Sequence, residues 1–217
     1  MDTVLEPLMN RPDLPQLVAT LNEQMQRERE SREAFLRDLT PDMKAEFIGG
    51  ERVLHSPARA EHIRVSRRLL MMITSHVMNH DLGEVFFEKA LVHLTRNDYE
   101  PDILFFCKEK AAKITPDQML FPAPDFIVEV LSDSTENRDR GIKFVDYASH
   151  GVAEYWIVDA KEKSVEQYLI GNGKYELSQK LKSGNIASVV VTGCEIPIAA
   201  IFDDEAHRTT LKSQPKA

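Results

Sequence analysis

The chain has few cysteines and no long apolar run. Its two cysteines, Cys107 and Cys194, lie far apart in 217 residues, so we expect buried thiols and neither a disulfide nor a cysteine metal site. No apolar run approaches the roughly 20 residues that span a bilayer. The first residues also lack the basic and apolar segments of a secretion signal. These absences predict a cytoplasmic protein that has no membrane segment.

Basic residues are also fewer than acidic ones. The 27 Lys and Arg residues against 35 Asp and Glu give a formal net charge of −8. Proteins that bind nucleic acid tightly usually carry a basic excess, because their affinity rests largely on phosphate contacts. The net charge therefore argues against strong non-specific DNA binding. An acidic chain can still bind DNA through a local basic patch. The length fits one well-buried domain with additions.

The pattern divides the chain into three parts: an N-terminal helical extension over 1–40, a main domain over 41–205 and a polar tail over 206–217. Prolines predict an extended lead over 1–13, and a helical stripe with a dense run of opposite charges follows over 14–39. This helix has a thin apolar face. One interpretation is a solvated helix that packs by its two ends, and the other is an arm that packs on a second subunit.

The main domain alternates strands and helices. A hairpin is predicted around Gly49-Gly50, followed by an amphipathic helix over 60–79. Strands are predicted next, and then a helix over 138–150 that buries Ile142, Val145 and Ala148. After a further strand, an antiparallel meander should end the domain. The predicted strands cover 85–94, 103–106, 126–131 and 155–158, and those of the meander cover 165–170, 175–181 and 187–192.

Two of these apolar strands carry a carboxylate that their pattern does not require. Asp102 opens the strand over 103–106, and Glu129 lies inside the strand over 126–131. Burying a carboxylate is costly unless it is paired, hydrogen-bonded or bound to a cation. If the two strands are neighbours, both side chains project to one point. Oxygen ligands there suit Mg²⁺ or Mn²⁺, which can activate a water for attack on a phosphodiester.

The helix after the Glu129 strand supplies a cation. Lys143 lies on it, with Tyr147 one turn further on the same face. A lysine near the metal would stabilise the negative charge of the transition state. Simpler interpretations remain for three residues: a turn cap for Asp102, an exposed helix lysine for Lys143 and a residue at the core edge for Tyr147. No simple structural role explains Glu129, since an apolar strand does not call for a glutamate.

These residues resemble a known family. Pro101-Asp102, then Glu129 in a strand, then a helix and a strand resemble the PD-(D/E)XK restriction-endonuclease-like superfamily. The chain is more narrowly similar to the Uma-type restriction-endonuclease family over about residues 45–202. The pieces that carry this similarity are Glu46-Phe-Ile-Gly-Gly-Glu51, His62, Pro101-Asp102, Glu129-Val-Leu-Ser132, Lys143, Tyr147 and Gly151-Val-Ala-Glu-Tyr-Trp-Ile-Val-Asp159.

The resemblance implies an α/β fold with an αβββαβ core and a mixed sheet, and Asp102 and Glu129 as catalytic metal ligands. The motif lysine belongs two residues after the acid, where this chain has Leu131. The resemblance therefore implies that Lys143 on the next helix takes the lysine's place. Glu46, His62 and Tyr147 are possible accessory residues.

Three hypotheses follow. The first is a Mg²⁺- or Mn²⁺-dependent endonuclease that hydrolyses DNA and acts as a homodimer. The second is a catalytically inactive binding or assembly module with a nuclease fold, which the acidic total and the displaced lysine favour. The third is a metal-dependent hydrolase that acts on a smaller phosphodiester, such as a nucleotide or an RNA end.

Overall fold

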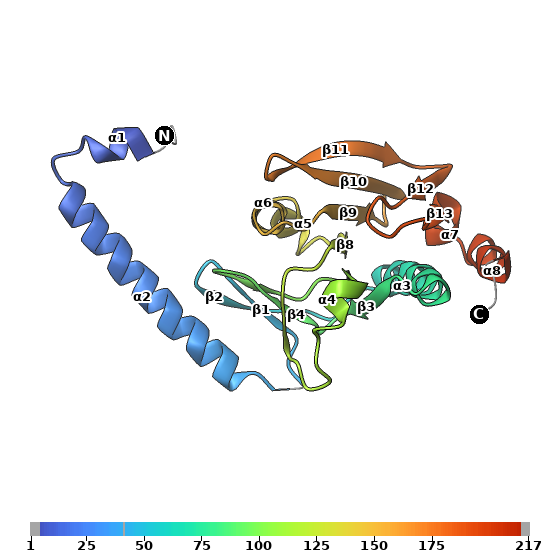
Figure 1. Ribbon diagram of the computed structural model, residues 1–217, viewed down its shortest axis with the longest axis horizontal. Helices are drawn as coiled ribbons and strands as arrows, with labels where there is room; N and C mark the ends of the chain where they lie inside the picture. The colour runs from blue at the N-terminus through green and yellow to red at the C-terminus, as the bar shows by residue number, and fades with distance from the viewer. Residues whose placement is uncertain (1–4, 41, 214–217) are drawn as a thin grey trace.

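A six-stranded mixed sheet forms the centre of the computed structural model, which describes residues 5–40 and 42–213 (Figure 1). Its strand order is β11-β10-β9-β8-β6-β3. Only β8 and β9 run parallel, and the other neighbours are antiparallel. The strands are β3 Gly83–Phe87, β6 Ile103–Cys107, β8 Phe126–Val130, β9 Glu154–Asp159, β10 Ser164–Gly171 and β11 Lys174–Leu181.

Helices lie on both faces of this sheet. Helix α3 (Ala60–His80) precedes β3, and helices α5 (Glu136–Asp139) and α6 (Ile142–Ser149) join β8 to β9. The chain order α3-β3-β6-β8-α6-β9 is the αβββαβ core that was predicted. A parallel pair such as β8 and β9 needs a crossover of this kind, because a short turn cannot return the chain to the same end of the sheet.

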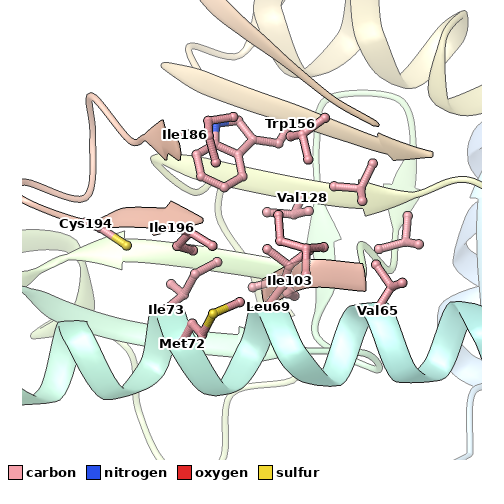
Figure 2. Close-up of a cluster of buried hydrophobic side chains, with 14 of the residues drawn as sticks. Val65, Leu69, Met72, Ile73, Ile103, Val128, Trp156, Ile186, Cys194 and Ile196 are labelled. Atoms are coloured by element: carbon pink, nitrogen blue, oxygen red, sulfur yellow. The ribbon is translucent and has the colours of Figure 1, made fainter. Parts of the chain in front are cut away.

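Alternation along the strands creates two cores. Phe126, Val128 and Val130 of β8 pack toward α3, and Figure 2 shows Leu69 and Ile73 of that helix beneath the sheet. The intervening residues of β8 face the opposite side, where Ile127 joins a cluster of aromatic residues around α6. Glu129 shares that second side by the period of two. It is therefore buried between the sheet and α6.

A second sheet of five short strands covers the α6 side. Its order is β2-β1-β5-β4-β7. The predicted hairpin is confirmed, with positive φ angles at Gly49 and Gly50 in the turn. All four residues of β1 are buried, so this strand is a wall of the interior. The strands are β1 Ala45–Ile48, β2 Glu51–Leu54, β4 Leu91–His93, β5 Asp98–Tyr99 and β7 Leu120–Phe121, and helix α4 covers Lys108–Ala111.

The N-terminal extension is largely helical. Helix α1 covers Leu5–Met9, within the segment predicted to be extended, and α2 covers Leu14–Asp38; residues 1–4 lie outside the described part. The C-terminal half of α2 docks on the small sheet. Phe35 packs against Phe47, with ring centroids 5.6 Å apart, and Arg32 donates two hydrogen bonds of 2.7 Å to Asp98. The N-terminal half projects from the body (Figure 1).

The prediction for residues 138–150 was wrong about the buried face. Ile142 is 39% exposed and Val145 is 67% exposed, whereas Lys143 and Tyr147 are buried. Ala148 is buried as predicted. The expectation that apolar residues face the interior fails here, because Lys143 and Tyr147, four residues apart, are held inside by buried carboxylates.

The C-terminal part differs from a three-stranded meander. Strand β12 (Asn185–Ala187) pairs with β13 (Glu195–Pro197) and not with β11. The cause is the buried carboxylate of Glu154, which accepts hydrogen bonds from Ser188 Oγ at 2.6 Å and from two following backbone amides at 2.9 Å. These bonds hold residues 188–190 in a loop.

The polar end of the chain is also helical. Helices α7 (Ile198–Phe202) and α8 (Asp204–Ser213) follow β13, and Arg68 of α3 donates to Asp204 at 3.1 Å. The predicted polar tail over 206–217 is therefore helical up to residue 213, and residues 214–217 lie outside the described part. Within 5–40 and 42–213, no helix is both long and apolar enough to cross a membrane.

Arg32→Ala should lower the free energy of unfolding by about 3 kcal/mol, because the buried carboxylate of Asp98 loses its guanidinium partner and keeps the ring of His93, 2.5 Å away. Arg27→Ala is the matched control on the same helix, since Arg27 forms only an exposed 3.6 Å ion pair with Glu23 and should change stability by less than about 0.5 kcal/mol. Urea unfolding would measure both variants. Equal, small effects would show that Arg32 does not hold α2 on the domain.

Candidate active site

A buried lysine surrounded by carboxylates lies between the two sheets. Lys143 Nζ is 2.8 Å from Glu46 Oε1, 2.9 Å from Glu129 Oε1 and 3.3 Å from Asp139 Oδ1. The Lys143 side chain is 2% exposed. The three acids come from β1, β8 and α5, so the small sheet, the central sheet and the crossover meet at one ammonium group.

Tyr147 completes the contacts of Glu129. Its hydroxyl donates to Glu129 Oε1 at 3.1 Å, the same oxygen that accepts from Lys143 at 2.9 Å. Lys143 and Tyr147 lie on one face of α6 because they are four residues apart. The two donors fix the orientation of the Glu129 carboxylate from the helix side.

Asp102 lies beside Glu129 on the neighbouring strand. Ile103 is opposite Val128 in the β6–β8 register, which places Asp102 opposite Glu129 at the next position. Asp102 Oδ2 accepts from the Val130 amide at 2.8 Å, and Oδ1 lies 3.1 Å from His62 Nε2. His62 belongs to α3, so a helix from the opposite layer orients this carboxylate. The fold thus brings together all six residues singled out in the sequence.

The charges of the buried pair are set by their neighbours. Burial favours the neutral amine, but the carboxylates of Glu129, Glu46 and Asp139 outweigh it and raise the pKa of Lys143 well above its ordinary value. Burial raises the pKa of Glu129 well above its ordinary value, and Asp139, Asp102 and Glu46 raise it further against the opposing effect of Lys143. The cluster therefore contains an ammonium group that keeps its charge, beside a carboxyl group that resists ionisation.

The pKa values of Glu46 and Asp102 are instead shifted below their ordinary values. Burial disfavours their charged forms, but Lys143 and His55 lower the pKa of Glu46 to about 2. The hydrogen bond and charge of His62 likewise outweigh burial and lower the pKa of Asp102. Burial opposes the charging of His62, yet Asp102 raises the pKa of this imidazole. Asp102 is thus the acid that stays ionised next to Glu129.

Sequence reasoning missed three residues of this region. Asp139 was not singled out in the sequence, although its spacing of four residues from Lys143 was a usable signal. His55 lies 3.3 Å from Glu46 Oε2. Glu100 donates its backbone amide to Glu46 Oε1 at 3.0 Å. His55 and Glu100 had no signal in the sequence, because only the pairing of distant strands brings them to Glu46.

The acid set fits a divalent cation in charge and in donor type. Among residues 5–40 and 42–213 no group of three or more His, Cys, Asp or Glu side chains has the geometry of a complete metal site. Asp102 and Glu129 offer two adjacent carboxylates. Both hydrogen bonds of the Glu129 side chain go to Oε1, which leaves Oε2 as the oxygen for a cation. Two carboxylates plus waters is a coordination typical of Mg²⁺.

Comparison with known proteins agrees with this architecture. A family model, Uma2, with the description "Putative restriction endonuclease", matches residues 32–199. The chain belongs to the Uma2 family. The matched region begins inside α2 and contains every residue of the site described above. The N-terminal half of α2 lies outside it.

Solved structures and curated proteins similar to this Uma2 protein include the following three. The structure, described as a putative nuclease belonging to DUF820 from Anabaena variabilis, has a TM-score of 0.67 at 18% identity and covers 77% of this chain and 94% of its own. This similarity shows that the two chains share a mixed α/β fold. Two uncharacterized Synechocystis proteins are 27% and 29% identical over 75% and 58% of this chain, and the matches cover 87% and 65% of their own lengths.

Glu129→Gln should change how stability depends on pH. Because the pKa of Glu129 is raised above its ordinary 4.5, the folded wild type keeps a proton that the unfolded chain has lost. Its contribution to stability is complete below about pH 4.5 and is lost as the pH rises through the folded pKa. The Tm of Glu129→Gln should therefore rise relative to that of the wild type as the pH increases above about 4.5.

Thermal unfolding across this pH range measures the difference. Glu84→Gln is the control, because Glu84 is an exposed glutamate on β3, and its Tm should stay parallel to that of the wild type. A parallel profile for Glu129→Gln as well would show that Glu129 ionises as an ordinary carboxyl.

Proposed function

We propose that this Uma2 protein is a metal-dependent endonuclease that hydrolyses phosphodiester bonds of DNA. The observation that carries the proposal is the buried Lys143 ammonium, 2.9 Å from Glu129 Oε1, with Asp102 on the adjacent strand. A buried ion pair is weak evidence for stability, since apolar residues of similar volume would serve as well. Family membership and the nuclease-like fold support a catalytic role for the buried pair of Lys143 and Glu129.

Asp102 and Glu129 would hold Mg²⁺ or Mn²⁺. When bound, such an ion polarises the phosphodiester and lowers the pKa of a coordinated water. His62 keeps Asp102 ionised and oriented, and Tyr147 orients Glu129. Lys143 keeps its charge over the whole physiological pH range and would stabilise the negative charge that develops on phosphorus oxygens. Because the pKa of Glu129 is raised by burial, cation binding should strengthen as the pH rises.

Nicking of supercoiled plasmid in Mg²⁺ or Mn²⁺ tests the proposal. Glu129→Gln and Lys143→Met retain side-chain volume and should each lower the nicking rate by about 100-fold or more, the usual cost of losing one electrostatic contact in a transition state. Glu84→Gln and Lys174→Met are exposed counterparts and should cleave like the wild type. Circular dichroism would confirm that each variant is folded.

The contrary results separate the other hypotheses. Unchanged nicking in Glu129→Gln would show that the activity does not use this site. A folded wild type that binds Mn²⁺ and DNA without cleaving would favour the inactive binding module. Turnover of a small phosphodiester such as bis(p-nitrophenyl) phosphate, with no effect on plasmid, would favour the small-substrate hydrolase.

Helix α2 favours a homodimer for the nuclease. Its docked face, which includes Glu28, Arg32 and Phe35, continues toward the N-terminus with the same alternating spacing of three and four residues. The continuation is apolar, with Val18 45%, Leu21 60% and Met25 52% exposed. An isolated helix gains little from such a face, whereas a second copy of the helix could bury it by packing at heptad-like spacing.

Leu21→Glu should dissociate this homodimer, because it places a charge in the buried seam. Sedimentation equilibrium would show a dimer for the wild type and a monomer for the variant. Leu177→Glu is the control, since Leu177 is 55% exposed on β11, and it should leave the mass unchanged. A monomeric wild type across micromolar concentrations would refute the homodimer.

A further inference from the structure

A concave site lies next to the candidate active site. A cavity of about 360 Å³ is lined by the segment that follows α2, the C-terminal end of β3 and the segment that carries β7. We call it the aromatic cavity, after Phe86, Phe87 and Phe121 in its lining. Its volume is in the range of small-ligand pockets. None of the six residues predicted from the sequence lines it.

The cavity presents aromatic surface that is open to solvent. Phe87 is 55% exposed and Met119 is 61% exposed. Phe86 and Phe121 also line the cavity and pack together with ring centroids 4.9 Å apart, so this part of the wall belongs to the core. An exposed ring on a rigid support offers a platform on which a planar group can stack.

Glu100 adds one polar group to this apolar wall. The residue lines the cavity and is only 6% exposed. Its Oε2 is buried and has no hydrogen-bond partner within the described residues. A buried carboxyl oxygen without a partner has unused hydrogen-bonding capacity.

Two hydrogen bonds connect the aromatic cavity to the candidate active site. The Glu100 amide donates to Glu46 Oε1 at 3.0 Å, which is also the oxygen 2.8 Å from Lys143. The Glu88 amide, next to Phe87, donates to the Asp102 carbonyl at 3.3 Å. A strand whose phosphate lies at Asp102 and Glu129 would therefore have neighbouring nucleotides close to the cavity.

We propose that the aromatic cavity binds an unpaired nucleobase of the nucleic-acid strand, which stacks on Phe87 and is hydrogen-bonded through its edge to Glu100. Aromatic rings bind single strands by stacking, which every base permits, and a few polar groups add base preference. Stacking also does not require a basic surface, which suits a chain with a net charge of −8. The inference rests on the proposed nuclease function.

The test compares single-stranded and duplex oligonucleotides of equal length by fluorescence anisotropy, in Mg²⁺ and in the Glu129→Gln background to prevent cleavage. Adding Phe87→Ala should weaken single-strand binding by about tenfold, the loss expected from one stacked base, and should change duplex binding less than about twofold. Leu177→Ala is the matched control, because Leu177 is also 55% exposed and lies on β11, at the other edge of the central sheet.

Glu100→Gln tests the polar group separately. The amide keeps the size of the carboxyl but has a fixed set of donors and acceptors, so the relative affinity for the four DNA homopolymers should change. An unchanged order of affinities would exclude Glu100 from base recognition.

Other outcomes would overturn the proposal. Single-strand affinity that is equal in Phe87→Ala and its parent would show that no base stacks there. A change of oligomeric mass in Phe87→Ala would identify the cavity as a protein–protein contact. If the wild type nicks plasmid but does not bind single strands, the proposal of base binding in the cavity is refuted and the nuclease proposal stands. If the wild type neither nicks plasmid nor binds single strands, both proposals are refuted.

Discussion

The structure depends on one buried cation. Lys143 Nζ lies within 3.3 Å of carboxylates from β1, β8 and α5, and a lysine at 2% exposure is tolerated only with such partners. Removing Lys143 would leave these acidic side chains in the interior without their cation. The ammonium group therefore constrains three parts of the chain at once: the hairpin that carries Glu46, the central strand that carries Glu129 and the crossover between β8 and β9.

This constraint explains why a second sheet lies over the site. Glu46 comes from β1, whose four residues are all buried, and β1 is held by pairing with β2 and β5. The β5 side in turn carries Asp98, which Arg32 of α2 neutralises. A chain of ion pairs thus links the N-terminal helix to the small sheet and the small sheet to Lys143. Packing of α2 and geometry of the site are connected through these contacts.

The sequence predicts most of the core and part of the site. Glu129 could be recognised because a glutamate in an apolar strand requires an explanation, and Asp102 because it opens the neighbouring strand. Lys143 depended on the family resemblance, since hydrophobic patterning turned Ile142 and Val145 inward and left the lysine outside. Glu100 and His55 could not be predicted from local pattern, because their position follows from pairing between strands that are far apart in sequence.

The position of the lysine has a geometric reason. Residue 131, two after Glu129, shares its side of the strand by the period of two, and here Leu131 packs into the aromatic core around α6. Lys143 reaches Glu129 from α6, which lies on that same side, and it also contacts Glu46 and Asp139. A lysine on β8 would extend from the same sheet as Glu129. Lys143 on α6 instead connects the sheet, the hairpin and the crossover through its three contacts. The displaced lysine thus holds together the layers between which the candidate active site lies.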